Sequence, residues 1–226
     1  MAVWRAGEER GVEGWICLGD TVGYGADPAA CLEAVRQRTA PTVLGNHDAA
    51  VVGRLDPSYF NPLALAAVRW TSAALGPAGL AYLAGLPMGL EEDGAFFVHA
   101  SPRLPERWDY IFGPADAAQA LEYSPARLCF VGHTHCPLAV RRPVDGPVEA
   151  VRAAVFGLEE GARYLVNVGS VGQPRDGDPR ACFALWDSGA RQVELVRVGY
   201  DIAGAQAKIL AAGLPARLAS RLEQGH

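Results

Sequence analysis

Aspartate, asparagine and histidine side chains follow four short apolar runs, and these residue types bind divalent metal ions. The five candidate ligands stand at or just beyond the ends of the runs: Asp20, Asn46, His99, His133 and His135. Because the carboxyl ends of neighbouring strands share one crevice in an open α/β sheet, we expect these side chains to converge. Imidazole, carboxylate and amide donors without thiolate suit Mn²⁺, Fe²⁺, Zn²⁺ or Ni²⁺. A lone histidine after a strand is more often structural, but this combination favours a metal site.

The apolar runs that precede the candidate ligands are short and rich in β-branched or aromatic residues, which predicts buried strands at Trp15–Leu18, Thr42–Leu44, Phe96–Val98 and Cys129–Val131. Between them the sequence predicts helices from Pro28 to about Arg38, Pro62 to about Ala74, Ala78 to about Ala84 and Pro114 to about Glu122. Asp27 and Asn61 are N-cap residues for the first two, each followed by proline at the first helical position.

After Cys136 the pattern changes to strands without intervening helices, at Leu138–Arg142, Val148–Arg152, Tyr164–Val168, Cys182–Trp186 and Gln192–Val198. Asp201 begins a C-terminal helical stretch. No repeat or long linker divides the chain, so we expect one α/β domain over residues 1–226, with its two halves packed as two sheets.

Composition limits the classes of function. The 226 residues carry a net charge of −5 and no block of basic residues, which argues against autonomous nucleic-acid binding. Five cysteines without a CxxC motif indicate reduced, buried thiols. No apolar run reaches the length of a membrane helix, so we expect a cytoplasmic protein without a membrane partner, in an oligomeric state that the sequence leaves open.

Four motifs in order resemble the calcineurin-like metallophosphoesterase superfamily, in particular its small bacterial and archaeal phosphodiesterase and phosphatase branch. They are the Gly-Asp that ends at Asp20 with Gly-Tyr-Gly after it, the Gly-Asn-His-Asp at 45–48, the Val-His at 98–99 and the Gly-His-Thr-His at 132–135. The resemblance covers essentially the whole chain. It implies a two-sheet β-sandwich flanked by helices, with a dinuclear metal centre at the strand ends.

The resemblance also implies a role for each residue. Asp20 would bridge two divalent ions, with Mn²⁺ as the first expectation and Fe, Zn or Ni as alternatives. Asn46, His99 and His133 would complete the second ion's site, and His135 would belong to the first. His47 would be the catalytic histidine beside the leaving group, oriented by Asp48.

One family motif, an Asp-x-His at the end of an opening strand, is absent before Asp20. We therefore expect the fold to lack its first strand, and the first ion to keep only Asp20 and His135 of its usual ligands. A start assigned downstream of the natural one, or a clipped N-terminus, is favoured over a naturally shortened enzyme.

The sequence thus predicts metal-dependent hydrolysis of a small phosphoester substrate, as a phosphodiesterase or phosphatase. The alternative is a non-catalytic scaffold with the same fold and an incomplete metal site. The net charge disfavours a nuclease. Arg103 and Arg175 lie near the same rim, where an arginine could clamp a phosphate, although solvated turn residues are the simpler interpretation. Asn167 is expected to bond loop backbone rather than metal.

Overall fold

The computed structural model describes residues 1–38 and 41–226, whose strands form two sheets. The larger, six-stranded sheet has the order β1-β2-β3-β7-β4-β5, and the smaller, three-stranded sheet has the order β6-β9-β8. The strands of the larger sheet are β1 Gly89–Glu92, β2 Ala95–Val98, β3 Leu128–Val131, β4 Leu138–Arg142, β5 Glu149–Val151 and β7 Arg163–Asn167. Those of the smaller sheet are β6 Val155–Gly157, β8 Ala181–Asp187 and β9 Gln192–Val198.

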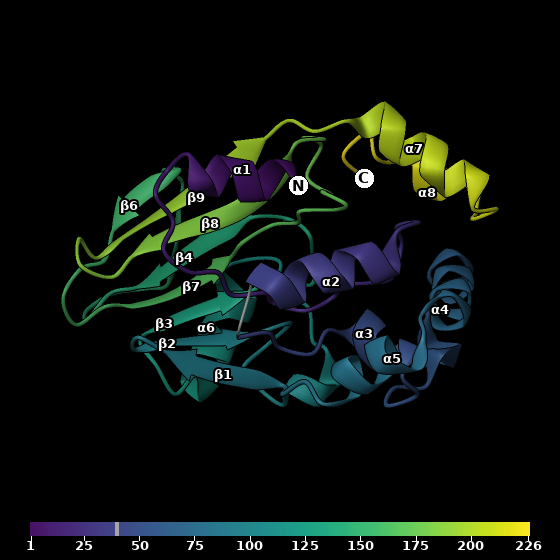
Figure 1. Ribbon diagram of the computed structural model, residues 1–226. Helices are drawn as coiled ribbons and strands as arrows, with labels where there is room; N and C mark the ends of the chain where they lie inside the picture. Colours follow the sequence, from purple (N-terminus) through teal and green to yellow (C-terminus); the bar gives the residue numbers. More distant parts are fainter. Residues whose placement is uncertain (39–40) are drawn as a thin grey trace.

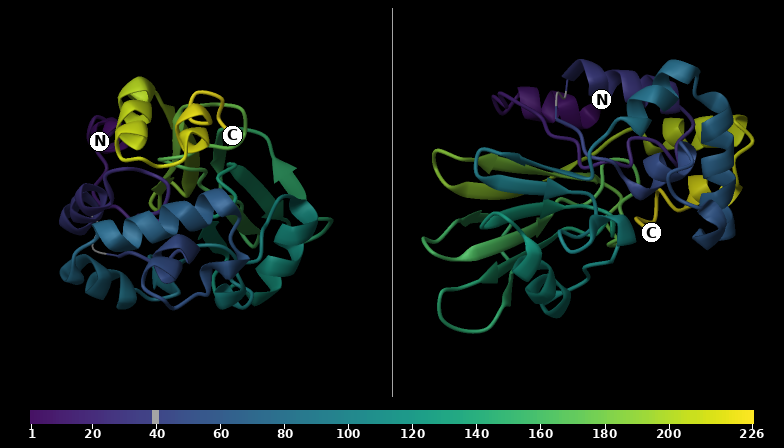
Figure 2. Two further views of the ribbon diagram at one scale, coloured as in Figure 1. Left: turned by 90° about the vertical axis from the view of Figure 1, so that its right-hand side faces the viewer. Right: turned by 90° about the horizontal axis from the view of Figure 1, so that it is seen from below.

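The helices lie mostly at one end of the sandwich, as Figure 1 and the view from below in Figure 2 show. Their bounds are α1 Ala2–Glu8, α2 Pro28–Arg38, α3 Asn46–Val51, α4 Pro62–Ala74, α5 Pro77–Ala84, α6 Pro114–Tyr123, α7 Ile202–Ala211 and α8 Ala216–Ser220, with short 3₁₀ turns at Pro57–Tyr59 and Pro105–Arg107. No helix in the described part of the chain is long and apolar enough to span a bilayer.

The two sheets pack face to face through aromatic side chains. Phe97 of β2 and Phe130 of β3 stack with their ring centroids 5.1 Å apart, and Trp186 of β8 lies 6.1 and 5.8 Å from them. The alternate residues of β3, Cys129 and Val131, point to the opposite face and pack under α6. Since side chains alternate along a strand, β3 is buried on both faces.

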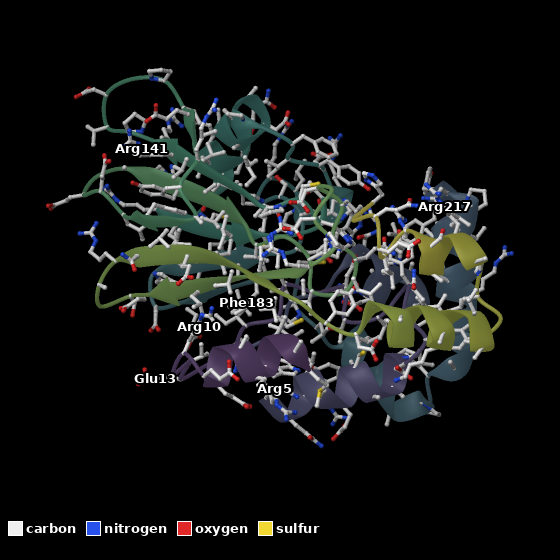
Figure 3. The ribbon with its side chains drawn as sticks, turned by 90° about the horizontal axis from the view of Figure 1, so that it is seen from above. Arg5, Arg10, Glu13, Arg141, Phe183 and Arg217 are labelled. Carbon is white, nitrogen blue, oxygen red and sulfur yellow. The ribbon has the colours of Figure 1, made fainter. Side chains whose placement is uncertain are left out.

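Helix α1 covers the outer face of the smaller sheet. Its Val3 and Ala6 form a buried cluster with Phe183 and Val196, against which Trp15 packs. Figure 3 shows Phe183 between the sheet and α1, with Arg5 on the far side of the helix.

Most of the predicted elements are confirmed. Strands β2 to β5 and β7 to β9, and the four helices expected in the first half, appear within one or two residues of their predicted bounds. The two halves of the chain do not correspond to the two sheets, however, because β4, β5 and β7 join the larger sheet beside β2 and β3. All five cysteines are free, but only Cys129 and Cys182 are buried, whereas Cys17 and Cys136 are half-buried and Cys31 is exposed.

The strands predicted at Trp15–Leu18 and Thr42–Leu44 are wrong. The two segments make only an isolated parallel bridge between Cys17 and Thr42. Its bonds are Cys17 N–H to Pro41 O and Val43 N–H to Cys17 O. Just beyond, Asp20 has a φ of +50° in the left-handed region, so the extended conformation ends before a ladder can form.

A buried carboxylate ties together the two loops that follow these segments. Asp48 has no exposed surface. Its Oδ2 accepts the N–H groups of Gly45 at 3.1 Å and Thr21 at 3.4 Å, and its Oδ1 accepts the N–H of Val22 at 3.3 Å. The Gly45 bond is half of a capping box that begins α3, because Asp48 is the third residue of the helix. One side chain therefore fixes the loop after Cys17 to the start of α3.

We expect Asp48→Ala to lower the free energy of unfolding by about 2–4 kcal/mol, because three N–H groups lose their acceptor. Asp48→Asn keeps one acceptor oxygen and should fall between that variant and the wild type. The measurement is urea unfolding at one pH, with Asp145→Ala in the exposed β4–β5 turn as the control, expected within about 0.5 kcal/mol of wild type. Equal stability of Asp48→Ala and Asp145→Ala would show that the carboxylate does not hold the loops.

Candidate metal centre

Four of the five predicted ligands meet at His99, which follows β2. Its Nε2 lies 3.2 Å from Asn46 Oδ1, 3.2 Å from His133 Nδ1 and 3.4 Å from Asp20 Oδ2. Its Nδ1 lies 2.6 Å from the carbonyl oxygen of Leu18. Residues up to 113 positions apart are thus brought to one buried point, since 133 − 20 = 113.

The position of the ring proton on His99 indicates that this point of the structure can accommodate a cation. The Leu18 carbonyl can only accept, so in the neutral ring of His99 the proton resides on Nδ1 and the lone pair of Nε2 faces other acceptors. Burial alone would lower the pKa of His99, but the charge and hydrogen bond of Asp20 together with the bond to Leu18 raise it. Burial likewise opposes ionisation of Asp20, but the surrounding histidines, His99 first among them, together lower the pKa of Asp20. Converging lone pairs of this kind are stabilised by a cation, either a proton or a metal ion.

The donor set fits a divalent ion in its chemistry, since it combines two imidazoles, a carboxylate and an amide oxygen. In the described ranges, 1–38 and 41–226, no three His, Cys, Asp or Glu side chains already form a group that could hold a metal ion. The donors instead surround His99 Nε2 at hydrogen-bonding distances. An ion would therefore have to take over the contacts that Nε2 now makes.

His135 lies apart from this group. Its Nδ1 is 2.7 Å from the carbonyl oxygen of Gln173, and its ring centroid is 6.5 Å from that of Tyr24. Burial, and next the charge of Arg175, lowers the pKa of His135 to about 3. Within the described residues no hydrogen bond joins it to the other four predicted ligands. Of the predicted residues, only Asp20 and His135 remain for a second ion.

Three of the five predicted ligands adopt the left-handed backbone conformation, with φ of +50° at Asp20, +64° at His133 and +63° at His135. Such conformations cost free energy for residues other than glycine and persist where surrounding contacts enforce them. Asn167 supplies such contacts: its Nδ2 donates to Gly132 O at 2.5 Å and Thr134 Oγ1 at 2.9 Å. The prediction that Asn167 bonds loop backbone is confirmed.

His47 lies beside the centre and packs against two aromatic rings. Its ring centroid is 4.4 Å from that of Tyr24 and 4.9 Å from that of Phe60, and only 4% of the residue is exposed. Its backbone N–H donates to Asp20 Oδ1 at 2.8 Å. Burial is the largest influence on the pKa of His47 and lowers it, so the ring is held neutral.

The expected orientation of His47 by Asp48 requires correction. Both oxygens of Asp48 accept backbone N–H groups, and Nδ1 of His47 has no hydrogen-bond partner among the described residues. The ring is instead placed by Tyr24, Phe60 and the close backbone of Gly23. Burial, then the charge of Asp20, raises the pKa of Asp48 to about 7.

Two aromatic side chains, Trp108 and Tyr110, cover His99 and His133. The sequence indicated only a packing role for Trp108 and no role for Tyr110. Trp108 lies edge-on to His99 with centroids 5.9 Å apart, and Tyr110 stacks on His133 at 4.2 Å. A cavity of about 350 Å³ opens beside Tyr110, with Arg103 in its lining. Trp108 itself has a left-handed φ of +57°, which no periodic pattern in the sequence signals.

Several known proteins are similar to this chain over nearly its whole length. An uncharacterized protein of Methanocaldococcus jannaschii, MJ0912, is 38% identical over 222 residues, which are 96% of this chain and 89% of that protein. The crystal structure of a metallophosphoesterase from Sphaerobacter thermophilus matches all of this chain and 94% of its own, with 40% identity and a TM-score of 0.86. The hypothetical protein PH1004 from Pyrococcus horikoshii shares the fold, at 20% identity and a TM-score of 0.75, over 99% of this chain and 90% of its own.

The model of the calcineurin-like phosphoesterase superfamily domain matches residues 2–190, nearly the whole chain. Membership of this family implies phosphoester hydrolysis and divalent metal ions, and the two sheets flanked by helices are the fold expected for it. The chain belongs to the calcineurin-like phosphoesterase superfamily.

Proposed function

We propose that this protein hydrolyses small phosphoesters with divalent metal ions held by Asp20, Asn46, His99 and His133. The observation that carries the proposal is the meeting of these four donors, from four separate segments, around Nε2 of His99. A buried convergence of lone pairs is unfavourable by itself. It is useful to a chain of this family because a cation can occupy it.

Divalent ions bound there would supply Lewis acidity toward phosphoryl oxygens and an activated water at neutral pH. Manganese is the ion that we propose first, since the donors are nitrogen and oxygen without thiolate. Asn46 and neutral imidazoles keep the negative charge of the site low, which leaves room for an anionic substrate.

His47 is the residue that we propose for the leaving group. Its backbone is bonded to Asp20, so its ring is fixed beside the proposed ion site. A neutral imidazole can hold a proton at one ring nitrogen for the departing alkoxide. Tyr24 and Phe60 restrict the ring to one orientation and exclude water from its faces.

The second candidate function is a non-catalytic scaffold. It is favoured by the two predicted donors, Asp20 and His135, that would be left for a second ion. Metal analysis of purified protein, together with Mn²⁺-dependent hydrolysis of p-nitrophenyl phosphate and bis-p-nitrophenyl phosphate, separates the two. Hydrolysis that a chelator abolishes and Mn²⁺ restores supports the enzyme, whereas bound metal without turnover of either ester supports the scaffold.

We expect His47→Ala to leave the metal content nearly unchanged and to lower kcat by about 10²–10⁴-fold on an alkyl phosphate such as glycerol 2-phosphate. The loss should be smaller on p-nitrophenyl phosphate, because nitrophenolate departs without a proton. Metal content is measured by plasma emission spectrometry of the same samples. Loss of bound metal in the variant would place His47 among the ligands instead.

Gly23 and Gly25 provide a matched pair that tests the position of the His47 ring. A Cβ at Gly23, whose φ is +145°, would lie 2.8 Å from His47 Nδ1, whereas a Cβ at Gly25 would meet nothing within 4 Å. We therefore expect Gly23→Ala to lower kcat on the alkyl phosphate by at least about 10-fold, and Gly25→Ala to have little effect. The two assays are run on protein whose folding is verified by circular dichroism. Equal activities of the two variants would mean that the ring position is not important.

A further inference from the structure

The loop after β7 places an arginine without an acidic partner at the edge of the candidate centre. The guanidinium carbon of Arg175 lies 5.4 Å from the centroid of the Tyr24 ring. Its Nε and Nη2 both approach the side-chain oxygen of Gln173, at 3.3 and 2.9 Å. No ion pair within residues 1–38 and 41–226 involves Arg175, so its positive charge is not neutralised by the protein.

Gln173 joins this arginine to a predicted metal ligand. Its backbone carbonyl accepts the Nδ1 hydrogen of His135, while its side-chain oxygen accepts from Arg175. The backbone N–H of Arg175 in turn donates to the carbonyl of His135 at 3.2 Å. Gln173 is only 3% exposed, and its Nε2 has no partner among the described residues. The guanidinium is therefore held in a fixed position relative to His135.

Tyr24 joins the same arginine to His47. One aromatic ring contacts both side chains, with the guanidinium carbon at 5.4 Å and the His47 centroid at 4.4 Å. Arg175 thus lies beside the region between His47 and His135, where the proposed function places the phosphoryl group of the substrate.

We propose that Arg175, held by Gln173 above Tyr24, binds the non-bridging phosphoryl oxygens of the substrate and makes the site prefer phosphomonoesters to phosphodiesters. The inference rests on the proposed function, since it assigns the substrate class of the same centre. A monoester carries nearly two negative charges at neutral pH, because its second pKa is about 6, whereas a diester carries one. Nη1 of Arg175 is not used in its bonds to Gln173, so the planar head can still donate to phosphoryl oxygens in a forked geometry.

The test compares Arg175→Ala and Arg175→Lys with wild type by kcat/KM on p-nitrophenyl phosphate and on bis-p-nitrophenyl phosphate with Mn²⁺. We expect wild type to favour the monoester, and Arg175→Ala to lose about 10–100-fold on it but no more than about 3-fold on the diester. Arg175→Lys keeps the charge without the fork and should recover part of the loss. Arg180→Ala is the control, because Arg180 lies in the same loop but is exposed and paired with Asp178, and both activities should remain unchanged.

Gln173→Glu tests the positioning role without changing the size of the side chain. Its carboxylate would pair with Arg175 and neutralise the charge, so the variant should lose monoester activity selectively and keep the diester activity. A merely structural role would lower both activities alike. Equal losses on both esters in Arg175→Ala, no loss on either, or a wild-type preference for the diester would overturn the inference.

Calorimetric titration with inorganic phosphate separates this inference from the proposed function. Wild type should bind phosphate at least about 10-fold more tightly than Arg175→Ala, while Arg180→Ala should match wild type. If wild type hydrolyses neither ester, the proposed function is wrong, and the titration still decides on Arg175. Equal phosphate affinity of wild type and Arg175→Ala would overturn the anion site.

Discussion

The centre depends on the close contact of two backbones, the loop at Asp20 and the start of α3 at Gly45. A Cβ on Gly45 would lie 2.1 Å from Asp20 Oδ1 and 2.2 Å from its backbone nitrogen, so no residue other than glycine fits without a shift. The contact allows the N–H of His47 to bond Asp20 and the carboxylate of Asp48 to bind both segments. Without it, Asp20 and Asn46 could not both reach His99.

The larger sheet supplies the other half of the site. The parallel strands β2, β3 and β7 end side by side, and the loops after β2 and β3 deliver His99 and His133. All of β3 is buried, and in β2 only Phe96 is half-buried, which gives the histidines a rigid support. Asn167, at the end of β7, bonds the residues on either side of His133 and so stabilises its left-handed conformation. A third strand therefore holds His133 in a backbone conformation that is unfavourable by itself.

The sequence was sufficient to predict that Asp20, Asn46, His99 and His133 converge, because each follows an apolar run. Only the runs before His99 and His133 are strands, however, and the fifth predicted ligand, His135, lies apart from the other four. The sequence did not reveal α3 Asn46–Val51, since the preceding apolar run was taken as a strand. Asp48 three residues after Gly45 was the available signal of a helix start. Strands β1 and β6 were missed because both are short edge strands with exposed residues, whose pairing is set by neighbours rather than by a periodic pattern. The roles of Trp108 and Gln173 follow from loop conformations and backbone bonds, which local sequence does not encode.

The central claim is that the lone pairs around His99 Nε2 form the site of a divalent ion. Anomalous diffraction from crystals of the protein grown with Mn²⁺ tests it most directly, because manganese is located independently of the protein atoms. The account predicts an anomalous peak within ligand distance of Asp20, Asn46, His99 and His133. A well-diffracting crystal with no peak at these residues, and with His99 Nε2 still hydrogen-bonded to Asn46, would contradict it.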